Sequence, residues 1–201
     1  MRRGYFAVVL VTLPLAACQQ SGSLDRSDLA APLAPSSVAA QTVERPYRSH
    51  GIWTVESIEW AGVPPATSTF GGRCSVPSHF VITATVTGEM THGGRFEGHA
   101  SHCAQLGLAP GVVSRYTDGR TSVRTANGDV LDGRYDNGTT DPQTGALHDT
   151  FTITGGTGRF EGATGGGEEW GQLPGPQAEV RPGTAATIEQ HGTITYAPGR
   201  Y

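Results

Sequence analysis

The sequence has no run of basic residues. Its 14 Lys and Arg residues are outnumbered by 18 Asp and Glu residues, and the formal net charge is −4. Proteins that bind nucleic acid contact the phosphate backbone through clustered Lys and Arg side chains. The charge distribution therefore argues against nucleic acid as a partner.

Catalytic motifs are missing as well. The chain contains no Gly-x-Ser-x-Gly elbow of a serine hydrolase and no phosphate loop that ends in Lys-Ser or Lys-Thr. The glycines of residues 155–167 do not follow Gly-x-Gly-x-x-Gly spacing, and no βαβ pattern surrounds them. Residues 136–141 lack the alternating oxygen ligands of a calcium loop. We expect no cofactor and no metal, and motifs identify no catalytic residue.

Long hydrophobic runs are scarce, and the one at the N-terminus has the layout of an export signal. Two arginines precede an apolar stretch over residues 5–15, which is too short to remain in a bilayer as a spanning helix. The stretch ends in Leu15-Ala16-Ala17-Cys18, which resembles the lipobox of bacterial lipoproteins, where the cysteine carries a diacylglycerol and becomes the mature N-terminus. We predict a signal peptide over residues 1–17 and lipidation of Cys18. The alternative is an ordinary cleaved signal that contains a cysteine.

The anchor implies a location and a tether. In lipoproteins an Asp after the cysteine commonly signals inner-membrane retention, so Gln19 favours the outer membrane of a Gram-negative cell envelope. Residues 18–48 are rich in Ser, Ala, Pro and Gln, and no aromatic residue follows Cys18 before Tyr47. A flexible linker of this length spans roughly 30 Å root-mean-square. Removal of the signal, with its two arginines and no acidic residue, takes the net charge from −4 to −6.

Cysteine is rare, and Cys18 is assigned to the lipid. Cys74 and Cys103 remain, and two cysteines in an exported protein are read first as a disulfide. A metal site is the alternative, because His99 and His102 neighbour Cys103, with His79 and His92 further off. The typical zinc-ligand spacings are absent, and in a strand His102 faces away from His99 and Cys103. We therefore predict the disulfide and no metal.

From residue 51 onward, glycine or proline interrupts most candidate helices, and period-two alternation takes their place. The alternation is clearest over residues 80–87, 147–154 and 187–196. Such a pattern suits a strand with one buried face and one wet face. Asp118-Gly119 and Asn127-Gly128 have the composition of two-residue hairpin turns, which predicts a three-strand meander over residues 112–136.

Short strands at regular spacing, without crossover helices, favour a barrel or a sandwich. Counting from Phe80 gives about eight strands, with another candidate over residues 52–60. We predict an all-β domain over residues 49–201, an antiparallel barrel of about eight strands, calycin-like in its architecture.

A pentapeptide repeat accompanies these strands. Gly-Arg-Phe-Glu-Gly occurs at residues 94–98 and again at 158–162, and each copy is expected to open the return strand of a hairpin. Its Phe points to one face, and its flanking glycines allow the strand to bend where a barrel closes. A ligand-binding loop is the alternative interpretation.

The second copy lies in a segment that resembles a known group. Residues 153–165 read Ile-Thr-Gly-Gly-Thr-Gly-Arg-Phe-Glu-Gly-Ala-Thr-Gly. This resembles a stretch common in secreted bacterial proteins that are related in fold to the allene oxide cyclase and dirigent-type barrels. Thr91-His92-Gly93-Gly94-Arg95-Phe96 and Ala126-Asn127-Gly128-Asp129 are similar to segments of the same group. The resemblance implies an eight-stranded antiparallel barrel with a central cavity over residues 78–197, and no catalytic residue of the group aligns with this chain.

Four polar residues fall on strand faces that otherwise look inward: His102, Asp149, Glu168 and Gln190. Glu168 shares the face of Phe160 provided that no bulge intervenes. A buried carboxylate needs a partner, water or a place at the barrel mouth. A carboxylate and a histidine that converge in a cavity can also serve as acid and base. We take these four residues as ligand-binding candidates, with barrel ends and bonds to water or backbone as the alternative.

These features support two main functional hypotheses. The first is a tethered barrel that binds a small, partly apolar molecule or serves as a structural envelope protein. The second is an isomerase or cyclase that uses the cavity, which requires Asp149, His102 or Glu168 to lie within reach of one cavity atom. A protein-interaction module is a third, which a large exposed apolar patch would support. The absence of catalytic motifs favours the first.

The lipid anchor predicts the behaviour of a single variant. Cys18→Ser removes the thiol that accepts the lipid, so the protein should leave the membrane fraction while its barrel stays folded. Fractionation of cells, with circular dichroism of the released protein, tests this. A variant that stays in the membrane fraction would contradict lipidation of Cys18.

Overall fold

The computed structural model describes residues 42–61, 68–107, 109 and 111–196. The predicted signal peptide, Cys18 and residues 19–41 of the predicted linker lie outside these ranges. No helix within the described ranges is long and apolar enough to cross a membrane.

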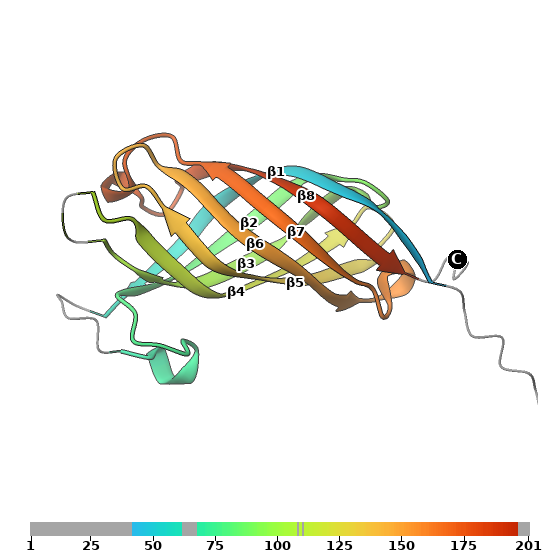
Figure 1. Ribbon diagram of the computed structural model, residues 1–201, viewed down its shortest axis with the longest axis horizontal. Helices are drawn as coiled ribbons and strands as arrows, with labels where there is room; N and C mark the ends of the chain where they lie inside the picture. Colours follow the sequence, from blue (N-terminus) through green and yellow to red (C-terminus); the bar gives the residue numbers. More distant parts are fainter. Residues whose placement is uncertain (1–41, 62–67, 108, 110, 197–201) are drawn as a thin grey trace, which may run out of the picture. The chain divides into compact units, whose positions relative to one another are not determined.

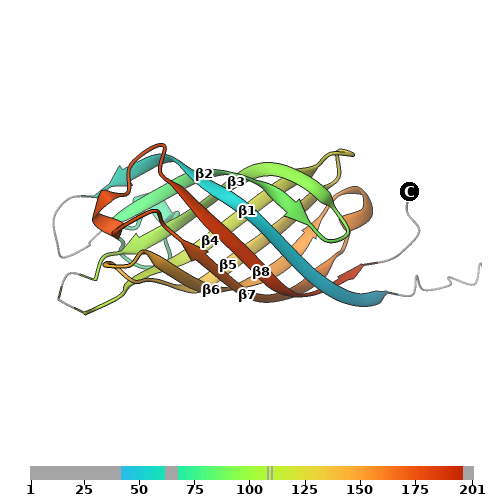
Figure 2. The same cartoon turned by 90° about the horizontal axis from the view of Figure 1, so that it is seen from above.

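The barrel consists of eight antiparallel strands that pair in sequence order and close on themselves (Figures 1 and 2). The strands are β1 (Val43–Trp60), β2 (Phe80–Met90), β3 (Gly94–Gln105), β4 (Ser114–Thr125), β5 (Val130–Thr140), β6 (Ala146–Gly156), β7 (Thr164–Gln172) and β8 (Ala185–Tyr196). Three short 3-10 segments accompany them: η1 (Phe70–Gly72), η2 (Gly158–Phe160) and η3 (Gln177–Glu179). The predicted all-β, eight-stranded antiparallel barrel is confirmed.

Alternation places one face of each strand in the interior, as the sequence pattern predicts. At the end where β1 begins and β8 ends, here called the closed end, apolar side chains fill the barrel: Met90, Phe96, Phe160, Ile194 and Tyr196. Phe160 and Ile194 have no exposed surface. Val43 pairs with Tyr196 at this end, so the first strand enters the barrel beside the last.

The first strand begins earlier than the sequence indicates. β1 starts at Val43, whereas the linker was expected to run to residue 48. Residues 43–48 pair with β8, and the Tyr47 side chain is buried. Pairing with a partner more than 140 residues away orders a segment whose own composition resembles a linker.

One predicted turn lies inside a strand. Asn127-Gly128 does form the turn between β4 and β5, but Asp118-Gly119 lies within β4, so the meander over residues 112–136 has two strands rather than three. Ser101 pairs with Arg120 and Cys103 with Thr117, which leaves Asp118 and Gly119 opposite the single residue His102. This is a β-bulge, with Asp118 at a positive φ of 56°. Turns and bulges both favour residues that accept positive φ, so the dipeptide alone does not distinguish them.

The two copies of the pentapeptide adopt different structures. The first opens β3 as predicted, whereas the second forms η2 and precedes β7. Both phenylalanines reach the core. Arg159 of the second copy bonds Asp129 at 2.7 Å and donates to the carbonyl oxygen of His92 at 2.7 Å, which ties three segments together at the closed end.

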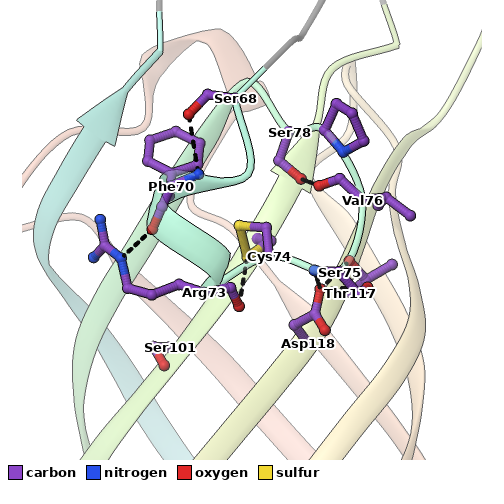
Figure 3. Close-up of a disulfide and its surroundings, with 12 residues drawn as sticks. Ser68, Phe70, Arg73, Cys74, Ser75, Val76, Ser78, Ser101, Thr117 and Asp118 are labelled. Atoms are coloured by element: carbon purple, nitrogen blue, oxygen red, sulfur yellow. Dashed lines mark hydrogen bonds between the residues drawn. A yellow bond between two sulfur atoms is a disulfide. The ribbon is translucent and has the colours of Figure 1, made fainter.

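The predicted Cys74–Cys103 disulfide is confirmed, with a Cα–Cα distance of 5.8 Å. It fastens the loop between β1 and β2 to the outer face of β3 (Figure 3). The bulge residue Asp118 accepts hydrogen bonds from the Ser75 amide and hydroxyl, both at 2.9 Å. The loop is therefore held at β3 and at the β4 bulge that faces His102.

The disulfide should contribute strongly to stability. The double variant Cys74→Ser, Cys103→Ser opens a loop closed across a sequence separation of 29. By loop-closure entropy, the free energy of unfolding should fall by about 3–4 kcal/mol. Urea denaturation of the variant and of the oxidised wild type measures this. A loss below about 1 kcal/mol would show that the denatured chain gains little freedom from the opened loop.

Candidate ligand-binding cavity

The barrel interior contains a cavity of about 300 Å³. Small inward-facing residues on three strands leave this space open at mid-height: Ala100, Thr121 and Gly133. Larger apolar side chains surround it, among them Trp53, Phe80, Phe96 and Phe151. The cavity thus exists because the interior is filled with large side chains toward the closed end and with small ones in the middle.

The cavity opens at the end opposite the closed end. Its lining there includes Trp60 at the end of β1, Arg115 near the start of β4 and Ala178 of η3, and all three are exposed. Phe160 and Ile194, which are fully buried at the closed end, are not part of the lining. We call the open end the mouth.

A chain of polar side chains runs along one side of the cavity. Gln190 accepts hydrogen bonds from the hydroxyls of Ser49 at 2.7 Å and Tyr47 at 3.3 Å, and its amide nitrogen donates to Glu169. Burial raises the pKa of Tyr47 to about 12, so this tyrosine stays protonated and donates its bond at neutral pH. Gln190 is thereby oriented with its donor toward Glu169.

Glu169 and Asp149 form a carboxyl pair. They are direct cross-strand partners on β7 and β6 and lie within hydrogen-bonding reach of each other. Oδ2 of Asp149 accepts a bond of 2.7 Å from the Tyr116 hydroxyl, whereas its Oδ1 has no other donor among the described residues. Burial, and for Glu169 also repulsion by Asp149, raises both pKa values. A proton shared between the two carboxyl groups supplies the missing donor and removes the repulsion.

His102 is held between two rings. Its imidazole stacks on Trp53, with centroids 5.2 Å apart and planes 4° apart, and on Tyr116 at 4.8 Å and 26°. Its Nδ1 lies 3.1 Å from the Tyr135 hydroxyl, which donates its own proton to the Ser101 carbonyl oxygen at 3.0 Å. Nδ1 must therefore be the protonated nitrogen. Burial lowers the pKa of His102 to about 3, so the ring is neutral at pH 7.

Two glycines position the tyrosines of this cluster. Tyr116 is the cross-strand partner of Gly138, and Tyr135 is the partner of Gly119. A Cβ at Gly138 would lie 1.9 Å from the Tyr116 ring, and one at Gly119 would lie 2.3 Å from the Tyr135 ring. Each ring therefore packs over bare backbone, which fixes the two hydroxyls toward Asp149 and His102.

The structure brings three of the four candidate residues to the cavity: His102, Asp149 and Gln190. Glu168 is the exception, because it lies on the outer face and bonds His148 at 2.8 Å. Glu169 occupies the inward position instead. The reason is η2, which breaks the alternation after Phe160, so that parity counted from Phe160 assigns the wrong face to β7.

The inward position of Glu169 depends on the register between β7 and β8. Glu169 pairs with Gln190 of β8, and cross-strand partners share a face, so the inward assignment of Gln190 carries over to Glu169 once this register is known. The roles of Trp53, Tyr116 and Tyr135 follow from long-range pairing, and no local sequence pattern indicates them.

The metal-site alternative finds no support in the described part of the chain. Cys103 is in the disulfide, and His99 lies on the outer face, 3.4 Å from Glu56. The described residues contain no group of three His, Cys, Asp or Glu side chains arranged to hold a metal ion.

Comparison with known proteins adds little to the geometry of the cavity. The sequence matches no protein-family model and no curated protein sequence. Among solved structures, the chain is similar to the pterocarpan synthase dirigent protein GePTS1, with a TM-score of 0.44, 12% identity, and coverage of 80% of this chain and 89% of that one. It is also similar to the pterocarpan synthase dirigent protein PsPTS1, with a TM-score of 0.42, 11% identity, and coverage of 79% and 97%. Likeness at this level identifies no ligand or reaction for this chain.

The carboxyl pair predicts a characteristic pH dependence of stability. Because the folded state raises both pKa values, it retains a proton that the unfolded chain releases above pH 4.5, the ordinary value for Glu169. Stability should therefore fall as pH rises from 4.5 toward the raised pKa, by up to about 1.4 kcal/mol per pH unit for one proton. Glu169→Gln should flatten this slope, because its amide donates to Asp149 without titrating.

Urea denaturation of wild type, Glu169→Gln and the outward control Glu168→Gln across pH 4.5–8 measures the difference. The lowered pKa of His102 makes stability rise with pH below pH 6.5, which opposes the effect of the carboxyl pair. This contribution is the same in all three proteins, so it cancels when their curves are compared. Parallel curves for wild type and Glu169→Gln would contradict the shared proton.

Proposed function

We propose that this protein is a small-molecule-binding barrel of the bacterial cell envelope, tethered to the outer membrane through lipid on Cys18. The ligand is compact and largely apolar, with one polar group. The observation that carries the proposal is the cavity, whose walls are mostly apolar and whose polar groups lie along one side. Small-molecule sites typically combine an apolar lining with a few polar groups that fix orientation.

The polar side of the cavity offers both donors and acceptors. Glu169 lies partly accessible beside Asp149, and Gln190 and Ser49 lie close by. Apolar rings on the other strands would hold the hydrocarbon part of a ligand while its polar group meets Glu169. A volume of about 300 Å³ suits a compact ligand of one to three rings rather than a lipid chain.

The position of the tether is compatible with access to the cavity. The predicted linker joins the barrel at Val43, which pairs with Tyr196 at the closed end. The mouth lies at the other end, around Trp60 and Arg115. Val43 and the mouth therefore lie at opposite ends of the barrel, which is compatible with exchange of ligand with the surrounding solvent.

A second candidate function is an isomerase or cyclase that acts on an apolar substrate in the cavity. One observation favours it. Asp149 and His102 both contact Tyr116, one through a hydrogen bond of 2.7 Å and the other through ring stacking. Carboxyl and imidazole groups thus converge on one cavity, with Glu169 in the place where the sequence suggested Glu168.

Filling the cavity should abolish binding. Ala100→Leu places a larger apolar side chain into the space, and the dissociation constant for the apolar dye N-phenylnaphthylamine should rise by about tenfold or more. Fluorescence titration measures the binding. The matched control is Ser101→Leu, the next residue on β3, whose side chain points outward.

The same two variants test whether the space exists. An empty cavity accommodates the leucine, so the free energy of unfolding of Ala100→Leu should change by less than about 1 kcal/mol, whereas overpacking of a filled core costs about 1–3 kcal/mol. Equal dye binding by both variants, or no dye binding by wild type, would remove the proposed ligand site.

A further inference from the structure

We propose that the cavity catalyses proton transfer on an enolisable carbonyl compound, with Nε2 of His102 as the base and the proton shared by Asp149 and Glu169 as the acid. This inference deepens the second candidate function and rests on the proposed function, since the substrate must first enter the cavity. The substrate class is a compact, apolar ketone or unsaturated ketone.

The hydrogen bonds around His102 make Nε2 the basic atom. The Tyr135 hydroxyl has one proton, and it donates that proton to the Ser101 carbonyl oxygen, so it accepts from Nδ1 of His102. In a neutral imidazole the other nitrogen then bears the lone pair. Within the described part of the chain the His102 side chain makes its hydrogen bond through Nδ1 and none through Nε2, and the ring lines the cavity. Stacking between Trp53 and Tyr116 holds this lone pair in a fixed direction.

The carboxyl pair makes a proton available on the same side of the barrel. Gln190 donates to one oxygen of Glu169, and Tyr116 donates to Oδ2 of Asp149. Both donors stabilise negative charge on the pair once the shared proton has left. A group arranged in this way can give its proton to a carbonyl oxygen and take it back.

Tyr116 sets the relation between base and acid. Its ring stacks on the imidazole at 4.8 Å, and its hydroxyl bonds Asp149 at 2.7 Å. The base therefore lies over the face of the Tyr116 ring, and the acid lies at its hydroxyl group. A flat substrate alongside that ring would present a carbon to His102 and its carbonyl oxygen to the carboxyl pair.

The reaction is balanced without an oxidant or a cofactor. Nε2 of His102 removes a proton from the carbon next to the carbonyl, the electrons of that C–H bond form the C=C bond of an enol, and the carbonyl oxygen takes the shared carboxyl proton. Return of the proton to the same carbon regenerates the ketone, and its return to a conjugated carbon shifts a double bond. Loss of the shared proton leaves a second negative charge on the carboxyl pair, and the imidazolium that forms at the same time compensates this added charge in the buried site.

The test uses solvent exchange in the full-length protein. β-Tetralone is incubated with protein in D₂O, and incorporation of deuterium next to the carbonyl is followed by NMR. Wild type should accelerate exchange above the buffer rate, and His102→Gln and Glu169→Gln should each reduce the protein-dependent rate by about 100-fold, as expected when a general base or acid is lost. The outward controls His99→Gln and Glu168→Gln should keep the wild-type rate.

Two further measurements separate the possible results. Circular dichroism checks that each variant is folded, and competition with N-phenylnaphthylamine reports whether β-tetralone and its hydrocarbon analogue tetralin bind. Exchange that depends on both His102 and Glu169 supports the inference. Binding of β-tetralone with exchange at the buffer rate overturns the inference and leaves the proposed function in place. If neither N-phenylnaphthylamine nor β-tetralone binds, the inference and the proposed function are both overturned.

Discussion

Pairing of β1 with β8 is the contact on which the rest of the structure depends. Twelve residue pairs, from Val43–Tyr196 to Thr54–Ala185, join the first strand to the last and turn an open sheet into a barrel. In the closed barrel all inward-facing side chains point into one common interior, so residues from distant parts of the chain become neighbours. It also orders residues 43–48, because their backbone groups find partners on β8.

Within this closed interior, side-chain size decides where space remains. Phe160 and Ile194 fill the closed end completely, whereas Ala100, Thr121 and Gly133 leave the middle open. The polar residues are then forced together, because a barrel of this size offers few ways to satisfy a buried carboxyl group. Asp149 meets this demand through Tyr116 and Glu169, and the same contacts give the cavity its chemical character.

Sequence reasoning failed where regular alternation is interrupted. Asp118-Gly119 has the composition of a turn but forms a bulge, since the Asp118 carboxylate anchors Ser75 and the extra residue is absorbed opposite His102. Glu168 was assigned to the wrong face because η2 resets the alternation before β7. The first error arises because turns and bulges favour the same residues, and the second because parity holds along a strand and is lost at any bulge or turn of unknown length.

The sequence by itself determined the strand content, the antiparallel barrel, the disulfide and the inward positions of His102, Asp149 and Gln190, because alternation and cysteine count are local or compositional properties. It also predicts the signal and the lipid on Cys18, which lie outside the described residues. Only the tertiary structure decided that Glu169 faces Asp149 and that His102 lies between Trp53 and Tyr116. These contacts depend on the register between strands, which is fixed by packing across the closed barrel and leaves no trace in any one segment.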